Sequence, residues 1–254
     1  MIKLTDTHAH YDDAAFEDDR YELLDRLFEE SVGKIVTVGC ALDRWQPALQ
    51  LADRYNNVFA ALGVHPEDID GLPEDYLQQL EKLSEHPKVK ALGEMGLDYH
   101  YENYDRERQI KVFREQLMLA DKLSMPVVIH SRDATADTLE ILHELRPKKA
   151  VMHCFSGSAE VAREVLDLGL YISFTGVVTF KNARRAVEAC NQVPLDRLML
   201  ETDCPYMAPE PYRGKRCDSS MIRSTAAKIG EIKGLDADEV IRLCNENADR
   251  FFNM

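Results

Sequence analysis

The chain has 254 residues, of which 45% are hydrophobic and 30% charged, so it can bury a substantial core in one large domain or two small ones. Its formal net charge of −14 argues against a general nucleic-acid coat protein, which needs a basic surface. The charge does not exclude a phosphate substrate, because bound divalent cations would dominate the local field.

Short, nearly continuous apolar runs recur along the chain and predict strands. Uninterrupted runs of this kind are typical of parallel sheets that are buried on both faces. Eight runs are present, and in chain order they cover residues 2–4, 35–38, 58–62, 89–92, 127–129, 150–152, 171–174 and 198–200.

Helical periodicity fills the segments between these runs. The clearest examples are Ala48, Leu51, Ala52 and Tyr55, then Ile110, Phe113, Leu117 and Ala120, and later Val161, Val165 and Leu168. Asp133 and Ser158 are predicted to cap the helices after the fifth and sixth strands. Residues 175–182 have no clear period, whereas residues 219–252 are predicted to form two amphipathic helices that close the structure.

The repeated alternation of strand and helix favours a barrel over an open doubly wound sheet, although open sheets share the rhythm. No linker, low-complexity tract or short repeat marks a domain boundary. We therefore predict a (β/α)₈ TIM-type barrel that forms a single domain over residues 1–254.

Histidines and acids stand where the predicted strands end. In a barrel these strand ends surround one mouth, which is where (β/α)₈ enzymes keep their active sites. The residues are His8 and His10 after the first strand, His65 after the third, Glu94 after the fourth, His130 after the fifth, His153 after the sixth and Asp203 after the eighth.

These residue types suit divalent cations. Imidazole suits zinc and other transition metals, whereas carboxylate suits harder ions such as magnesium and manganese. His8 and His10 are two apart in an extended segment, so their side chains point the same way and could chelate one ion together. Two ions about 3.5–4 Å apart would need a bridging group, and Glu94 is the natural candidate because a carboxylate has two oxygens.

Each of these residues has a simpler explanation when it is taken alone. A His-x-His pair can be incidental, His65 can cap or pack, and Glu94 and Asp203 can cap the helices that follow. Capping favours Ser, Thr, Asp and Asn over His, so six candidate ligands at five strand ends favour a metal site. His100 is a weaker candidate for the mouth. Cys154 and Cys204 are interpreted as incidental neighbours whose side chains point to the opposite face.

Taken together, these motifs resemble the TatD-like family of metal-dependent hydrolases, within the wider amidohydrolase-like barrels. The motifs run in family order across nearly the full chain. They are D-T-H-A-H (6–10), G-V-H-P (63–66), G-E-M-G-L-D-Y (93–99), P-V-V-I-H-S-R-D-A (126–134), H-C-F-S-G (153–157) and E-T-D-C-P-Y (201–206).

The resemblance implies a two-metal centre with magnesium or manganese supporting activity and zinc, nickel or iron as alternatives. It assigns one cation to His8, His10, Glu94 and Asp203, and the other to Glu94, His130 and His153, with Glu94 bridging. Members of the family are described as deoxyribonucleases, often exonucleases, and related proteins remove D-amino acids from tRNA.

One segment departs from the family pattern. After Pro209 the family usually shows R-G-K-x-N-E-P, but here residues 213–216 are followed by Cys217, Asp218 and Ser219. The candidate ligands are unaffected. The change puts in doubt the loop that shapes the mouth in the family, so it leaves the substrate preference open.

The leading hypothesis is a metal-dependent deoxyribonuclease with DNA or another phosphodiester as its substrate. Metal binding would lower the pKa of a coordinated water, and Asp203 could accept its proton, with Glu94 holding the metals. His65 and Arg132 could steady phosphate oxygens, because arginine presents a planar fork. Alternatively, Arg132 forms an ion pair with Asp133 or Asp137.

Two other functions stay open. A metal-activated water could also hydrolyse a carboxylic ester or amide, such as an aminoacyl-tRNA bond, and a third possibility is a catalytically silent binding protein. The basic residues Arg213, Lys215 and Arg216 are either a solvated loop or a guide for a nucleic-acid backbone. Tyrosines that could stack on bases are Tyr99, Tyr101, Tyr104, Tyr206 and Tyr212.

The remaining features concern location. The N-terminal residues MIKLTDTHAH show no basic leader followed by an apolar run, and the longest apolar runs are far too short for a membrane span. Six scattered cysteines without a C-x-x-C pair favour reduced thiols. We therefore expect a cytoplasmic protein with no membrane partner and no obligate protein partner.

Overall fold

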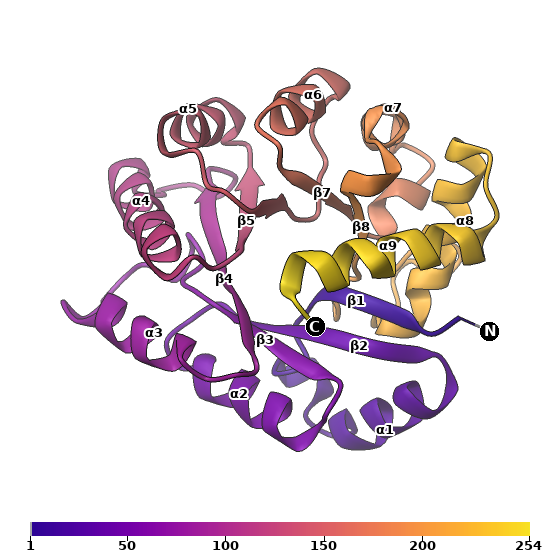
Figure 1. The fold of residues 1–254 in the computed structure, drawn as a ribbon, viewed down its shortest axis with the longest axis horizontal. Helices are drawn as coiled ribbons and strands as arrows, with labels where there is room; N and C mark the ends of the chain where they lie inside the picture. Colours follow the sequence, from indigo (N-terminus) through magenta and orange to yellow (C-terminus); the bar gives the residue numbers. More distant parts are fainter. Residues whose placement is uncertain (1) are drawn as a thin grey trace.

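The computed structural model describes residues 2–254, and its strands form a parallel barrel with the helices outside (Figure 1). Each strand is hydrogen-bonded to the next one along the chain, from β1 to β8. Beyond the end of β8, the Asp203 amide donates to the His8 carbonyl (2.9 Å), and the His10 amide donates to the Cys204 carbonyl (2.8 Å). These bonds join the carboxyl end of β1 to the segment after β8, so the predicted barrel is confirmed.

The strands are short, and most agree with the predicted runs. They are β1 (Leu4–Ala9), β2 (Val32–Gly39), β3 (Val58–Leu62), β4 (Val89–Asp98), β5 (Val127–Arg132), β6 (Ala150–Met152), β7 (Tyr171–Phe174) and β8 (Leu198–Leu200). The prediction for the first strand was wrong, because β1 begins at Leu4 and continues through Asp6 and His8. These polar side chains are fully buried, so the carboxyl end of the strand is not an apolar run.

The helices alternate with the strands as predicted. They are α1 (Arg20–Glu30), α2 (Trp45–Arg54), α3 (Tyr76–Ser84), α4 (Arg106–Leu123), α5 (Thr135–Leu145), α6 (Ala159–Asp167), α7 (Arg184–Gln192), α8 (Ile222–Lys233) and α9 (Ala237–Phe252). Short 3₁₀ helices are η1 (Ala14–Phe16), η2 (Gly176–Thr179), η3 (Leu195–Arg197) and η4 (Ser219–Met221). Helices α8 and α9 are the two closing helices expected near the C-terminus, and η2 accounts for the segment that had no clear period.

Of the two predicted caps, one is present. The Ser158 hydroxyl accepts a hydrogen bond from the Val161 amide (3.4 Å) at the start of α6. The Asp133 prediction was wrong: α5 begins at Thr135 after Ala134, and no side chain caps it. Asp133 has a positive φ of 54°, and its carboxylate instead contacts His100 Nδ1 (2.8 Å).

Helix α9 lies across the amino-terminal ends of the strands. Asp249 pairs with Lys34 near the start of β2 (2.6 Å), and the Asn247 amide donates to the Leu198 carbonyl at the start of β8 (2.8 Å). Phe251 and Phe252 pack against the small apolar residues that fill the barrel interior. One end of the barrel is therefore closed by apolar packing, which leaves the carboxyl end for a site. Across residues 2–254, no helix combines the length and the apolar character that a bilayer crossing requires.

Candidate metal centre

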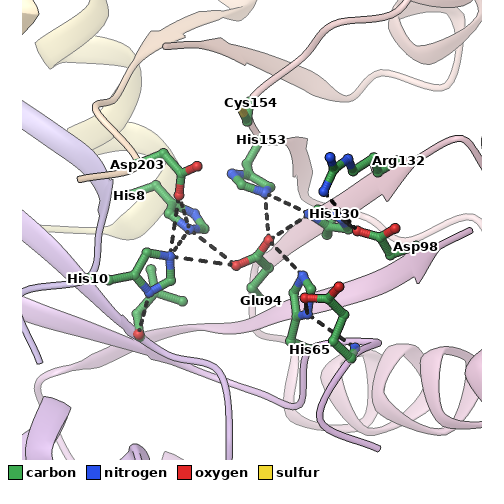
Figure 2. Close-up of polar contacts among 12 residues, drawn as sticks. His8, His10, His65, Glu94, Asp98, His130, Arg132, His153, Cys154 and Asp203 are labelled. Atoms are coloured by element: carbon green, nitrogen blue, oxygen red, sulfur yellow. Dashed lines mark hydrogen bonds and ion pairs between the residues drawn. The ribbon is translucent and has the colours of Figure 1, made fainter. Parts of the chain in front are cut away.

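One cavity lies among the carboxyl ends of the strands, and the predicted site residues gather at it (Figure 2). Its volume is about 790 Å³, within the size range of small-molecule sites. His8 lies directly behind the lining, with no exposed surface. The predicted residues that line the cavity are His10, His65, Glu94, His130, Arg132, His153 and Asp203.

Glu94 occupies the centre of the cluster and faces two groups of histidines (Figure 2). Its Oε2 lies 3.4 Å from His8 Nε2 and 3.8 Å from His10 Nε2. Its Oε1 lies 2.8 Å from His130 Nδ1 and 2.6 Å from His153 Nε2. Burial raises the pKa of Glu94, but the surrounding histidines outweigh this and hold its pKa well below the usual value. The carboxylate is therefore ionised, with one oxygen toward each group.

The backbone that carries Glu94 needs glycine beside it. Gly93 has a φ of 138°, and a Cβ there would lie 2.5 Å from the Val128 carbonyl oxygen of β5. Glycine permits both the positive φ and the close approach of the two strands. The G-E-M-G sequence thus brings Glu94 to the centre of the barrel mouth.

The first group consists of His8, His10 and Asp203. The two Nε2 atoms of the histidines are 3.1 Å apart, and Asp203 Oδ1 lies 3.3 Å from His10 Nε2 and 3.7 Å from His8 Nε2. Burial and the neighbouring His153 lower the pKa of His8. Burial raises the pKa of Asp203, but His10, His8 and His153 bring it below the ordinary value. Burial lowers the pKa of His10, but contacts led by the hydrogen bond to Asp203 outweigh this and hold its pKa well above the ordinary value. His10 must therefore lose a proton before it binds a cation, whereas the Asp203 carboxylate is already in the ionised form.

The second group consists of His130 and His153, and each has a buried carboxylate behind it. Asp98 Oδ2 lies 3.0 Å from His130 Nε2, and Glu201 Oε1 lies 3.5 Å from His153 Nδ1. Sequence reasoning gave neither acid a role. The alternation of β4 contained a usable signal for Asp98, because a residue four positions after Glu94 points to the same face.

Two buried glutamines of α4 fix the strand ends beside the cluster. The Gln109 amide group exchanges hydrogen bonds with the Asp98 backbone, both of 2.8 Å. The Gln116 amide group does the same with Val64, at 2.8 and 3.0 Å, just before His65. These contacts also escaped the sequence reasoning, since a glutamine on the inner face of a helix carries no distinctive pattern.

Asp6 ties β1 to the segment that carries Asp203. Its carboxylate accepts hydrogen bonds from the Thr202 amide (3.0 Å), the Thr202 hydroxyl (2.6 Å) and the Ser219 hydroxyl (2.6 Å). Burial raises the pKa of Asp6 to about 7, although these hydrogen bonds lower it. Cys217 and Ser219 are fully buried in this region. The segment that departs from the family pattern therefore lies inside the protein beside β1, and its residues 217–219 are not part of the cavity lining.

The two predicted substrate-binding residues flank the cluster. His65 Nε2 lies 3.7 Å from Glu94 Oε1, and the Glu67 amide donates to His65 Nδ1 (3.2 Å). The Arg132 guanidinium lies 5.2 Å from the ring centre of Tyr101 and 4.0 Å from Asp98. The alternative partners expected for Arg132 have other contacts: Asp133 contacts His100, and Asp137 binds Arg106 and Tyr99.

The weaker candidates are divided between the cavity and the outer surface. Tyr101 and Tyr206 line the cavity, whereas Tyr99 stacks on Tyr104 at a centroid distance of 4.5 Å. Cys154 also lines the cavity, against expectation, because β6 ends at Met152 and Cys154 has a positive φ of 44°. Strand alternation does not apply there.

The basic cluster is held by the protein's own side chains. Arg216 pairs with Asp19 (2.6 Å), and the Arg213 guanidinium lies 4.3 Å from the ring centre of Phe180. Lys215 Nζ lies 5.9 Å from the ring centre of Tyr212. These contacts agree with the simpler interpretation of a surface loop.

Comparison with known proteins places this geometry in a family. The model of the family described as TatD related DNase matches residues 5–253. The chain is 42% identical to the uncharacterized metal-dependent hydrolase YabD of Bacillus subtilis, over 99% of both chains. It is 38% identical to the uncharacterized metal-dependent hydrolase YcfH of Escherichia coli K12, over 99% of this chain and 96% of that one. The crystal structure of the E. coli TatD homologue YjjV superimposes with a TM-score of 0.93 at 31% identity, covering 99% of this chain and 98% of that one. The chain belongs to the TatD family of metal-dependent hydrolases.

Proposed function

We propose that the chain is a divalent-metal-dependent deoxyribonuclease that hydrolyses phosphodiester bonds at the ends of DNA strands. The observation that carries the proposal is the position of Glu94, whose two carboxylate oxygens each face a separate group of histidines. The description of the matching family as TatD related DNase supports the choice of DNA.

The donor set fits two divalent cations. We assign one position to His8, His10, Asp203 and Glu94, and the other to Glu94, His130 and His153. Imidazole nitrogens only 3.1 Å apart, next to two ionised carboxylates, are the arrangement expected of a cation site. Magnesium or manganese suits the phosphoryl chemistry, and zinc, nickel or iron suits the many imidazoles. Bound cations of this kind lower the pKa of water and neutralise the charge that develops on a phosphoryl group.

Asp203 is the proposed proton acceptor. Its Oδ1 faces His10 at 3.3 Å, which leaves Oδ2 to accept the proton of the attacking water. The side chain of Asp203 is 13% exposed, against 5% for Glu94, so water reaches Asp203 more easily. Glu94, enclosed by histidines on both sides, serves to hold the two positions together.

His65 and Arg132 are the proposed phosphate-binding residues. Burial lowers the pKa of His65 to about 4, so the ring is neutral at pH 7. Because the Glu67 amide donates to Nδ1, the ring proton lies on Nε2, on the side of Glu94. His65 can therefore donate one hydrogen bond to a phosphate oxygen, and the Arg132 fork can donate two.

To test the proposal, the protein is stripped of metal with a chelator and single metals are added back. Hydrolysis of single-stranded DNA, aminoacyl-tRNA and an aryl phosphodiester is then measured side by side. DNA cleavage should return with magnesium or manganese and fall by at least about a hundredfold in Glu94→Ala, since the variant loses the shared carboxylate. The matched control is His143→Gln, because His143 is an exposed histidine on α5 that pairs with Glu164 (2.8 Å).

The other outcomes distinguish the alternatives. Metal-restored activity confined to aminoacyl-tRNA would replace the proposal with an ester or amide hydrolase such as a D-aminoacyl-tRNA deacylase. Metal binding without turnover of any of the three substrates would indicate a silent binding protein.

A further inference from the structure

Charge is distributed unevenly around the cavity. The loops after β1, β2 and β3 contribute five carboxylates and one cation to its lining: Asp12, Asp13, Asp43, Glu67, Asp68 and Arg44. The lining residues from β5 through η2 include no carboxylate and one cation, Arg132. In an eight-stranded barrel the loops after β1 and β2 lie across the mouth from those after β5 and β6, whereas Glu67, after β3, lies closer to Arg132. One side is therefore anionic, and the opposite side is neutral to cationic.

Asp12 is the most enclosed carboxylate on the anionic side. It lines the cavity, yet it is only 8% exposed. Its backbone carbonyl accepts hydrogen bonds from Arg20 (3.1 Å) and Arg44 (3.2 Å), which fix its position. Its Oδ2 lies 4.0 Å from Arg44 Nη1, whereas within residues 2–254 its buried Oδ1 has no hydrogen-bond partner. A buried carboxylate oxygen without a donor is costly, so a substrate group that donates a hydrogen bond would be favoured there.

The anionic side disfavours the backbone of DNA. Asp43 has a side chain that is 83% exposed, and a phosphate placed near it would meet like charge. The terminal nucleoside is the part of a DNA strand that has no further phosphate beyond it. The opposite side offers Arg132 to the rest of the chain, and Tyr101 beside it offers a face for stacking.

We propose that the anionic side binds the terminal nucleoside of the substrate, with Asp12 accepting a hydrogen bond from its free hydroxyl group, while the remaining phosphodiester chain leaves past Arg132. This inference rests on the proposed nuclease function and adds a selection rule to it. Strand ends with a hydroxyl group are accepted, and strand ends with a terminal phosphate are rejected.

The experiment compares single-stranded oligonucleotides of one sequence with a hydroxyl or a phosphate at the 3′ end and at the 5′ end, in magnesium and in manganese. At whichever end is degraded, a terminal phosphate should lower kcat/KM by at least about tenfold, mainly through KM. Raising the salt concentration should bring the kcat/KM values for hydroxyl and phosphate ends closer together, because salt screens exposed charges.

Two variants at the mouth and one control distinguish an effect of the mouth carboxylates on substrate choice from a general effect on folding. Asp12→Ala should lower kcat/KM for the hydroxyl end and narrow the ratio of kcat/KM between hydroxyl and phosphate ends, because it removes the hydrogen-bond acceptor. Asp43→Lys alters an exposed side chain and should narrow the ratio by reversing a charge at the mouth. Glu29→Lys, the same type of charge change on the exposed surface of α1, should leave the ratio unchanged.

Equal kcat/KM for hydroxyl and phosphate ends, with DNA still hydrolysed, would overturn this inference and leave the nuclease proposal standing. Failure to hydrolyse any of the oligonucleotides with either metal, while aminoacyl-tRNA is turned over, would overturn both.

Discussion

The histidines of the cavity differ in which group lies nearest their second ring nitrogen. His130 and His153 each have a buried carboxylate behind the ring, Asp98 at 3.0 Å and Glu201 at 3.5 Å. His10 instead has a neutral partner, the Val38 carbonyl at 3.2 Å. A carboxylate behind a histidine orients the ring and raises its basicity as a ligand. The two halves of the site are therefore not equivalent, and Asp98 should contribute to the affinity of the half with His130 and His153.

Asp98→Asn tests this difference at a single residue. The amide keeps the size of the side chain but removes the charge behind His130, so the dissociation constant for manganese should rise about 10- to 100-fold. Titration calorimetry of the metal-free protein measures it directly. Asp133→Asn is the matched control, because Asp133 contacts His100 outside the cluster (2.8 Å). Equal affinities for Asp98→Asn and the parent protein would show that Asp98 only fills space.

At the scale of elements, the strands that carry the site differ from ordinary apolar strands. β1 continues through Asp6 and His8, β4 through Glu94 and Asp98, and β5 as far as Arg132. Asp6, His8, Glu94 and Asp98 are buried at these strand ends because the barrel brings polar side chains from several strands together. A pattern of apolar runs therefore predicts the part of each strand that helices cover. It does not predict the polar residues with which β1, β4 and β5 continue toward the cavity.

The contact between α5 and the start of α4 should make a contribution to stability that depends on pH. Asp137 accepts hydrogen bonds from Arg106 (2.7 Å) and the Tyr99 hydroxyl (2.6 Å), and these lower its pKa below the ordinary value of 3.8. The ionised form is thus favoured by folding. Its contribution is full at pH well above 3.8 and is lost as the pH falls through the folded-state pKa.

Asp137→Asn should lower the free energy of unfolding at pH 7 by about 1–2 kcal/mol, because hydrogen bonds to a charged acceptor are strong while solvent screens the Arg106 pair. Urea denaturation at pH 7, 5 and 3.5 should show the difference shrinking at the lowest pH. Asp121→Asn, at the exposed pair with Lys148 (2.8 Å), should change little at any pH. If the difference in free energy of unfolding between Asp137→Asn and the parent protein stays constant down to pH 3.5, the loss comes from packing and not from charge.

At the scale of the whole molecule, the alternation of eight apolar runs with helical segments favoured a barrel over an open sheet with the same rhythm, and the structure confirms the barrel. The barrel in turn predicted that His8, Glu94, His130 and Asp203 would meet, and the structure places them around one cavity. The turns beyond the strand ends were not predictable. Asp133 and Cys154 both adopt a positive φ, which no alternation rule anticipates. The carboxylates behind the histidines were also missed, because such contacts depend on the orientation of side chains from different strands.

Metal binding should also stabilise the entire barrel. The cluster joins β1, β4, β5, the residue after β6 and the segment after β8, so a cation held there binds the folded chain and not the unfolded one. Such binding stabilises by RT ln(1 + [L]/Kd), about 2.7 kcal/mol at a metal concentration of 100 Kd. For a protein of 254 residues this corresponds to a rise in Tm of about 5–10 °C by calorimetry.

The rise in Tm should be larger at pH 8 than at pH 6, because histidine ligands must lose their protons before they bind. It should be much smaller in Glu94→Ala, which lacks the carboxylate that faces both groups. His143→Gln, on the outside of α5, should retain it. An equal rise in Glu94→Ala and the parent protein would mean that the cations bind elsewhere, and the proposed centre would then be wrong even if the protein proved to be a nuclease.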